Sequence, residues 1–284
     1  MIGEALSVSA ALLWAASAVI SAKVLRDIDP LSTNALRCLF SAISMLFIAF
    51  WMGEIQTASN LDLYGLVLVI LSAIIGFGLG DTCLYKSITL IGVSKSYVVA
   101  YTFPFFTMVL ATLFLGEPLL PRYLIGTAII FLGIMSIVVN VNIGRKVESP
   151  VGLLAAFAAA IFWSTGLILI TIGIKKMGVI LANTVRFPFL FIFLLLASRL
   201  WKKSSDISKG NLLLLAASGI FGMTFGGIIF LFGIQFIGIS KATPLSASSP
   251  VWASLMSNLF LKERFTLRNI ASAFMVVTGI YFLT

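Results

Sequence analysis

The sequence predicts an all-α membrane protein with ten transmembrane helices, arranged as two inverted-topology five-helix repeats. Three observations lead to this prediction. Of the 284 residues, 60% are hydrophobic and only 10% are charged, whereas about a quarter of the residues in a soluble domain are charged. Uncharged stretches close to or above the roughly 20 residues that cross a bilayer recur along the whole chain. The second half of the chain also repeats the motifs of the first half.

The uncharged stretches give the expected helices in chain order. In the first half they are 5–22, 38–53, 63–80, 96–116 and 123–144, and in the second half they are 149–174, 177–198 (interrupted by Arg186), 210–240, 242–261 and 269–284. They lack the roughly ten-residue segments of alternating hydrophobicity that are typical of a membrane β-barrel. Because backbone polar groups in lipid must be satisfied within the segment, we expect a helical bundle.

The repeat pairs residues of the two halves, which are 1–144 and 150–284. The pairs include Gly3 and Gly152, Trp14 and Trp163, Asn34 and Asn183, Arg37 and Arg186, Gly76 and Gly222, Lys95 and Lys241, Pro104 and Pro250, and Glu117 and Glu263. Five helices per half is an odd number, so the second half would enter the membrane from the opposite side. Inverted repeats of this kind are a design of secondary transporters, in which two related halves open a central site alternately.

Both halves resemble a known family domain. The residues that carry the resemblance are Trp14, the Pro30–Arg37 segment, the GVSKSY corner at 92–97, Pro104 and Glu117, and in the second half Trp163, Arg186, the GISKAT corner at 238–243, Pro250 and Glu263. Together they resemble the EamA domain of the drug/metabolite transporter superfamily. The resemblance implies a ten-helix transporter of small metabolites, with a cavity lined mainly by the third, fourth, eighth and ninth helices and with cytoplasmic termini. The connection GEIQTASNLD lacks the family's usual basic cluster.

The net charge of +9 would suggest nucleic-acid binding in a soluble protein, but here it indicates topology. Most of the 19 lysines and arginines lie in the connections after the first, third, fifth, seventh and ninth helices. Positive charge favours the cytoplasmic face, which places both termini outside, against the family habit. Glu4 stands where a signal peptide would carry a basic residue, so we expect the first helix to be retained. We expect a multi-pass protein of the cell membrane.

The residue inventory argues against an enzyme, a metal site and a cofactor. The chain has no histidine, no paired intramembrane carboxylates and no nucleotide-binding motif, and Cys38 and Cys83 lack metal-type spacing. We expect no cofactor, no metal and no nucleic-acid partner. The expected partners are a small-molecule substrate, protons as a candidate coupling ion, and the lipid bilayer. Monomer and homodimer both stay open.

Asp81 is the clearest candidate for a transport role. It follows an uncharged run in GFGLGDTCLYKS, and a carboxylate at membrane depth is costly enough that it usually faces a cavity or a partner. Its repeat equivalent is Gly227, so the shared scaffold does not require an acid there. Asp81 is therefore a candidate site for a proton or the substrate. Alternatively, it lies near the end of the third helix and pairs with Lys86.

Paired arginines and tryptophans allow two interpretations each. Because both halves keep the arginine, we favour a structural role for Arg37 and Arg186, with long side chains that reach the interface, over binding of an anionic group. Trp14 and Trp163 occupy mid-helix positions, so they either line a cavity or pack in the core.

Pro104 and Pro250 are expected to kink the fourth and ninth helices, and such breaks tend to lie beside transport sites. The halves differ around these prolines. In the first half, the candidates for the cavity wall are aromatic: Tyr85, Tyr97 and Tyr101. In the second half, most of the candidates bear a hydroxyl: Ser246, Ser248, Ser249 and Trp252. An aromatic wall facing a hydroxyl-rich wall would suit a small amphipathic solute such as an amino acid. Alternatively, the hydroxyls bond to their own helix backbone.

Glutamates and glycines are given structural roles. Glu117 and Glu263 follow the fourth and ninth helices and are expected to pair with Arg122 and Arg264, as structural or gating residues. Gly76 and Gly80, like Gly222 and Gly226, are spaced so that helices can approach closely.

The sequence thus predicts a secondary active transporter that exports amino acids or related amphipathic solutes by alternating access. A flippase for a lipid-linked intermediate is the alternative, and a membrane-embedded enzyme is a weaker one.

Overall fold

The computed structural model describes residues 1–24, 28–57, 62–138, 149–200, 207–260 and 266–284. These parts of the chain are helical and contain no strand. The elements of the first half are α1 (Ile2–Val24), α2 (Pro30–Trp51), α3 (Glu54–Thr57), α4 (Leu63–Ser72), the π-helical segment η2 (Ala73–Gly80), α5 (Asp81–Ile91), α6 (Val93–Ala100), α7 (Phe103–Leu115) and α8 (Pro121–Val138).

The elements of the second half follow the same order. They are α9 (Pro150–Met177), α10 (Val179–Leu200), α11 (Lys209–Ser218), the π-helical segment η3 (Gly219–Phe225), α12 (Gly226–Ile237), α13 (Ile239–Ser246), α14 (Ser249–Phe260) and α15 (Leu267–Leu283). Both halves thus place a π-helical segment inside one long span and an interruption inside the next.

Local sequence signals explain where the helices begin and turn. The Asp29 carboxylate accepts a hydrogen bond from the Ser32 backbone N–H at 3.0 Å, and Pro30 opens α2, because an acceptor side chain before a proline satisfies a free N–H of the first turn. Gly92 and Gly238 have φ of 83° and 78°. Only glycine adopts such a φ without strain, so the corners between α5 and α6 and between α12 and α13 depend on it.

Eight helical stretches of the described residues are long and apolar enough to cross a membrane. They include two continuous spans, Leu63–Ile91 and Lys209–Ile237, each of which contains a π-helical segment. The third helix therefore continues well beyond Gly80, where the uncharged stretch ends. The pair α13–α14 and the shorter apolar helix α15 occupy the places of the ninth and tenth expected helices, so the count of ten stays a prediction.

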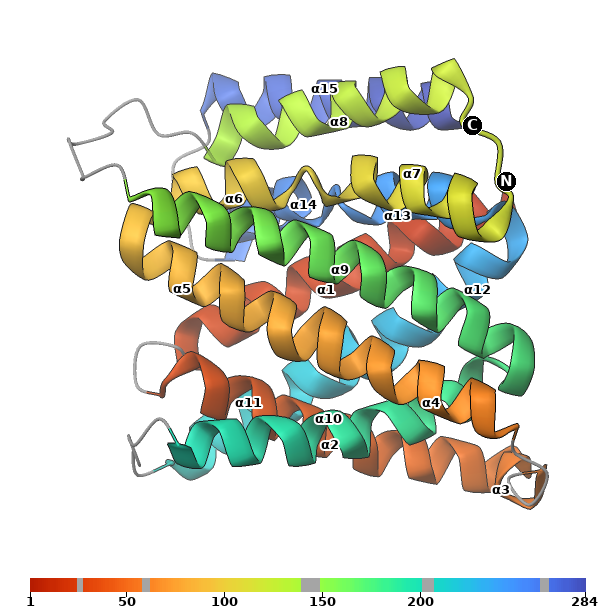
Figure 1. The fold of residues 1–284 in the computed structure, drawn as a ribbon. Helices are drawn as coiled ribbons and strands as arrows, with labels where there is room; N and C mark the ends of the chain where they lie inside the picture. Colours follow the sequence, from red (N-terminus) through yellow and green to blue (C-terminus); the bar gives the residue numbers. More distant parts are fainter. Residues whose placement is uncertain (25–27, 58–61, 139–148, 201–206, 261–265) are drawn as a thin grey trace.

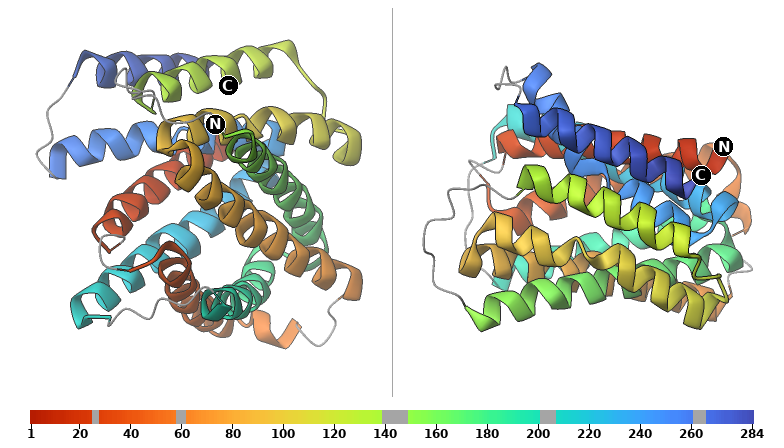
Figure 2. Two further views of the ribbon diagram at one scale, coloured as in Figure 1. Left: turned by 60° about the vertical axis from the view of Figure 1, so that its left-hand side comes forward. Right: turned by 90° about the horizontal axis from the view of Figure 1, so that it is seen from above.

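The helices pack in corresponding pairs from the two halves. Figure 1 shows α8 and α15 side by side along one edge of the bundle and α2 and α10 together at the opposite edge. Between these edges, α1 packs against α11, η3 and α12, while α9 packs against α4, η2 and α5. Figure 2 shows the same layering from two further directions, with the two ends of the chain on the same side of the bundle.

Glycines permit the closest approaches between helices. A Cβ atom on Gly166 of α9 would lie 2.6 Å from the Gly76 Cα atom of η2, and one on Gly126 of α8 would lie 2.8 Å from the Gly279 carbonyl oxygen of α15. Small residues at such contacts let backbones approach, which is a main source of helix association in lipid. The predicted packing role of Gly76 is therefore confirmed.

Large apolar side chains cover the outside of the bundle. Phe47, Phe50, Trp51, Leu113, Phe114, Phe274 and Tyr281 are all exposed by more than half. In water, so many exposed large apolar side chains would be unfavourable, whereas lipid chains would cover them in a membrane. Together with the apolar spans, this surface makes the chain a multi-pass membrane protein.

Candidate functional site

A cavity of about 270 Å³ lies in the middle of the bundle. Its first-half walls come from α1, α2, the η2–α5 span and the α6–α7 break, with Trp14, Asn34, Arg37, Gly76, Phe77, Asp81, Tyr101 and Phe103. Its second-half walls come from α9, α10, the η3–α12 span and the α13–α14 break, with Trp163, Gly166, Leu167, Arg186, Phe187, Met223, Gly227, Phe230, Leu231, Ser246, Ala247 and Ser249.

The cavity wall is broader than the expected one. The third, fourth, eighth and ninth helices do contribute, but so do α1, α2, α9 and α10, whereas none of these lining residues belongs to α8 or α15. The outer pair of helices instead packs on itself. Within the described part of the chain, four spans from each half therefore surround the site.

Asp81 lies in the middle of its span and is held from two other helices. Its carboxylate accepts a hydrogen bond from Trp163 Nε1 at 2.9 Å and another from Asn34 Nδ2 at 3.3 Å. The alternative interpretation, an ion pair with Lys86 at the end of a helix, does not hold, because these neutral donors are the partners of Asp81. A carboxylate satisfied by neutral donors and facing a cavity can accept a proton or a cationic group.

Aromatic rings surround this side of the cavity. The Trp163 ring contacts the rings of Phe103 and Tyr101 edge-on, with centroids 5.6 and 6.3 Å apart. Tyr97 stacks on Tyr101 at 5.3 Å, one layer further from the cavity. The aromatic wall predicted for the first half is thus built by Tyr101, with Trp163 and Phe103 beside it, whereas Tyr85 and Tyr97 do not line the cavity.

Trp14 stands at the equivalent place in the other half but makes a different hydrogen bond. Its Nε1 donates to the Gly222 backbone carbonyl at 2.9 Å, within η3. Its ring lies 5.1 Å from the Phe230 ring. Both tryptophans therefore line the cavity, and each donates a hydrogen bond to a residue of the opposite half.

The two arginines line the cavity, where side chains that reach the membrane interface were expected. Their structural role stays a prediction. Arg37 Nη2 donates to Ser17 Oγ at 3.0 Å. Arg186 is 6% exposed, and its guanidinium carbon lies 4.5 Å from the centre of the Phe77 ring. A buried guanidinium over an aromatic face gains cation–π attraction, but it still lacks the solvation that an interface would supply.

The helix breaks differ from the predicted kinks. Pro104 and Pro250 each occupy the second position of a new helix, α7 and α14, so the spans are interrupted at residues 101–102 and 247–248 rather than bent around the prolines. The Phe103 carbonyl near the first break accepts a hydrogen bond from Ser164 Oγ of α9 at 2.9 Å. The broken span is thus anchored to the other half of the protein.

Hydroxyls around the second break are divided between two roles. Ser246 and Ser249 line the cavity, although Ser246 Oγ also donates to the Thr243 carbonyl at 2.9 Å. Ser248 is fully buried, donates to the Leu245 carbonyl at 2.6 Å and accepts from Trp252 Nε1 at 3.0 Å. Ser248 and Trp252 therefore belong to the packed core and not to the cavity wall.

Glu117 binds the start of α13 instead of pairing with Arg122. Its two carboxylate oxygens accept hydrogen bonds from the backbone N–H groups of Ile239 and Ser240, both at 2.8 Å. A carboxylate at a helix N-terminus satisfies free donors and complements the helix dipole. Arg122 lies over the Tyr123 ring instead. Glu263 and Arg264 lie outside the described residues.

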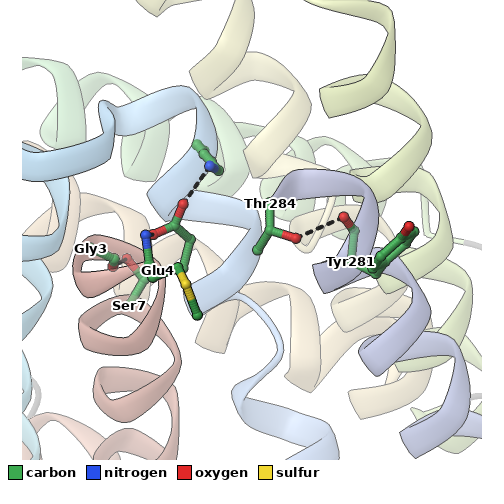
Figure 3. A network of polar contacts seen from close by, with 7 residues as sticks. Gly3, Glu4, Ser7, Tyr281 and Thr284 are labelled. Atoms are coloured by element: carbon green, nitrogen blue, oxygen red, sulfur yellow. Dashed lines mark hydrogen bonds and ion pairs between the residues drawn. The ribbon is translucent and has the colours of Figure 1, made fainter.

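A buried ion pair lies beside this contact. Lys241 Nζ of α13 and Glu4 Oε1 of α1 are 2.5 Å apart, and both side chains are nearly enclosed. Figure 3 shows Glu4 on the first turn of α1 with Gly3 and Ser7 next to it. The GISKAT corner is thus held by two carboxylates, that of Glu4 in α1 and that of Glu117 just after α7.

Asn34 is the main site residue that the sequence-based candidates omit. Its repetition as Asn183, within NALRCLF and NTVRFPF, is a signal that could have found it. Phe77, Phe103 and Met223 had no comparable signal, because apolar residues are common in every span. Among the residues that the structure describes, no group of three His, Cys, Asp or Glu side chains is placed to hold a metal.

A bundle of apolar spans around a cavity that contains an acid and two arginines is typical of one class, the α-helical membrane transport proteins. Comparison with known families identifies the particular one. The EamA-like transporter family matches residues 1–139 and, a second time, residues 150–284. The chain therefore belongs to the EamA-like transporter family and, with it, to the drug/metabolite transporter superfamily.

Individual relatives agree with this assignment. The chain is 26% identical over 280 residues to an "Uncharacterized transporter" of Archaeoglobus fulgidus, covering 98% of this chain and 96% of the relative. It is 22% identical over 279 residues to "Uncharacterized transporter YoaV" of Bacillus subtilis, with coverages of 98% and 94%. A solved crystal structure at 17% identity superposes with a TM-score of 0.84 over 99% of this chain and 96% of the other, which shows a shared fold.

Proposed function

We propose that the protein is a secondary active transporter that exports a small amphipathic solute, of amino-acid size, through the central cavity. The observation that carries this proposal is that matched residues of the two halves meet in one cavity. Trp14 and Trp163 both line it, and so do Arg37 and Arg186. A site built equally by two related halves can be exposed to either side of the membrane when the halves exchange conformations.

The packing supports alternating access through inverted repeats. In each half, one long helix crosses to the π-containing span of the other half, with α1 on η3 and α9 on η2. Two spans facing the cavity are interrupted, near Tyr101 and near Ala247. Interrupted helices beside a central site are typical of such transporters, since a short break lets one half-helix move without the other.

The size and lining of the cavity support a small solute. Its volume of about 270 Å³ is below the roughly 300–1,000 Å³ of sites for drug-sized ligands. Aromatic rings, a carboxylate and guanidinium groups offer both apolar and polar contacts. An amino acid or a related amphipathic metabolite would match these surroundings, and we assign Asp81 the role of binding the coupling proton.

Transport by purified protein in proteoliposomes tests this function. Uptake and counterflow are measured with a pool of radiolabelled amino acids and small metabolites, with and without an imposed proton gradient, against protein-free liposomes. We expect saturable movement of at least one pooled solute, accelerated by the gradient. If no pooled solute moves, a secondary transporter of small metabolites is contradicted.

A flippase is the second candidate, because two arginines in a cavity could bind a phosphate of a lipid head group. This candidate predicts that a fluorescent lipid with a phosphate-bearing head group changes leaflet in the same proteoliposomes. Lipid translocation without movement of any water-soluble solute would favour it over the first proposal.

A further inference from the structure

Among the differences between the two halves around the cavity, two remove a polar group from the second half. Asp81 corresponds to Gly227, and Ser17 corresponds to Gly166. The two neighbouring polar residues are kept, since Asn34 corresponds to Asn183 and Arg37 to Arg186. The consequences of each missing group can therefore be read by comparing the halves.

In the first half, the Asn34 amide and the Arg37 guanidinium each have a side-chain partner, although Arg37 Nε itself is buried without one. Asn34 Nδ2 donates to the Asp81 carboxylate at 3.3 Å, and Arg37 Nη2 donates to Ser17 Oγ at 3.0 Å. Arg37 also lies near enough to Asp81 for electrostatic attraction. The carboxylate of this half is therefore supplied by the protein itself.

In the second half, the corresponding groups have lost these partners. Asn183 is fully buried, yet neither Oδ1 nor Nδ2 of its amide has a hydrogen-bond partner. Arg186 Nε is buried without a partner, as Arg37 Nε is, but among the described residues no carboxylate lies within ion-pair distance of Arg186 and no residue takes the place of Ser17. Asn183 and Arg186 are three residues apart on α10, so they share one helix face.

Space for a ligand group exists beside these two side chains. Gly227 lines the cavity. A Cβ atom built on Gly227 would lie 3.8 Å from Phe187 Cζ and 3.9 Å from Asn183 Oδ1, which are ordinary contact distances. The position of Gly227 can thus accept further atoms without a clash, and those atoms would lie next to Asn183 Oδ1. A carboxylate there accepts a hydrogen bond from Asn183 once the amide turns its NH₂ group toward Gly227.

These observations point to an anionic ligand. A buried guanidinium without a counter-ion is costly, and so is a buried amide whose hydrogen bonds are not made. A carboxylate would relieve both, because it accepts hydrogen bonds from an amide NH₂ and from a guanidinium. A carboxylate is also the group that occupies the equivalent place in the first half.

We propose that the space beside Gly227 is the subsite for the carboxylate of the transported solute, with Asn183 and Arg186 as its hydrogen-bond donors. The proposal rests on the transport function proposed above and narrows its substrate class to solutes that bear a carboxylate. Trp14 is not among the donors, because its Nε1 already donates to the Gly222 carbonyl.

The test places a carboxylate of the protein itself in the subsite proposed for the carboxylate of the solute. Gly227→Asp introduces the acid of the first half, and Gly227→Ala is the matched control because its added Cβ atom fits. We expect Gly227→Asp to reduce gradient-driven uptake of the pooled amino acids at least tenfold relative to Gly227→Ala. We also expect the wild-type protein to transport amino acids in preference to the corresponding amino-acid amides.

A second readout does not depend on transport. The carboxylate introduced by Gly227→Asp would satisfy Asn183 and Arg186, so the melting temperature of this variant in detergent should exceed that of Gly227→Ala by roughly 2–4 °C. Such a rise without transport of any solute would support the subsite while contradicting the proposed function.

Transport of amino acids by Gly227→Asp at the wild-type rate would overturn the subsite and leave the transport function standing. Equal transport of amino acids and their amides would do the same. If Gly227→Asp does not fold, Asn183→Ala replaces it in the uptake assay. Its apparent affinity for amino acids should then fall at least tenfold, and an unchanged affinity would overturn the proposal.

Discussion

Asp81 illustrates how a single residue acquires its role from residues distant in the chain. The sequence marks it as unusual, because it is an acid after an uncharged run whose repeat equivalent is glycine. The structure adds the donors, Trp163 from α9 and Asn34 from α2. Among the described residues, these contacts hold the carboxylate at the cavity wall without an ion pair, as the proposed proton site requires.

Replacement of Asp81 by asparagine tests the assigned proton site. Asparagine keeps the size of the side chain, but its amide does not take up a proton near neutral pH. Gradient-driven uptake should therefore fall at least tenfold. Counterflow at equal pH on both sides should persist, because exchange of solute needs no net proton movement. Both are measured in the same proteoliposomes, and undiminished stimulation by the proton gradient in Asp81→Asn would remove Asp81 from the coupling mechanism.

At the scale of elements, the corner between α12 and α13 depends on carboxylates from elsewhere in the chain. Glu117 caps the N-terminus of α13 at Ile239 and Ser240, and Glu4 pairs with the next residue, Lys241. The repeat predicted this corner, but it could not predict its partners. Local pattern indicates that a helix begins after Gly238, whereas the identity of the capping group depends on how α7 and α13 pack.

Loss of the Glu117 cap should destabilise the protein measurably. Glu117→Ala removes two hydrogen bonds to a charged acceptor, worth about 1.5–3 kcal/mol each at most. Glu117→Gln keeps one acceptor oxygen but not the charge, so it should lose roughly half as much or more, though still less than Glu117→Ala. Thermal unfolding in detergent, followed by tryptophan fluorescence, gives the order wild type, Glu117→Gln, Glu117→Ala. Equal melting temperatures for all three would show that the cap contributes nothing to stability.

The Glu4–Lys241 pair should behave as a coupled unit. Glu4→Gln leaves a nearly buried ammonium group without an acid, which we expect to cost about 3 kcal/mol or less, since removal of one partner of a buried pair is more costly than replacement of both. The double variant Glu4→Gln with Lys241→Met should therefore be more stable than Glu4→Gln alone. A double-mutant cycle on melting temperature measures this coupling, and strictly additive effects would contradict it.

At the scale of the whole molecule, the sequence predicts the architecture better than the site. Charge-free stretches and paired motifs indicate the helical membrane bundle and the order of its elements. They place the end of the third helix at Gly80, because a charge in lipid is expected to end a span. Here Asp81 is instead satisfied inside the bundle by Trp163, so the helix continues to Ile91.

The composition of the cavity wall follows from packing that the sequence does not display. Arg186 and Arg37 look like interface anchors because both halves keep them, yet the spans orient both side chains toward the cavity. Ser248 and Ser249 are neighbours of the same type, but only Ser249 lines the cavity. The helix rotation that separates them arises from contacts among α13, α14 and the other spans, which no local pattern encodes.

The proposed function requires above all that one cavity is exposed alternately to both sides of the membrane, and cysteine labelling measures this exposure. Ser246→Cys places a thiol on the cavity wall, and Ser248→Cys places one in the adjacent packed core, both in a background with Cys38 and Cys83 replaced by alanine. A membrane-impermeant maleimide is applied to vesicles of either orientation. We expect position 246 to be labelled from both sides and position 248 from neither. Labelling at position 246 from one side only, in the presence of transported solute, would contradict alternating access.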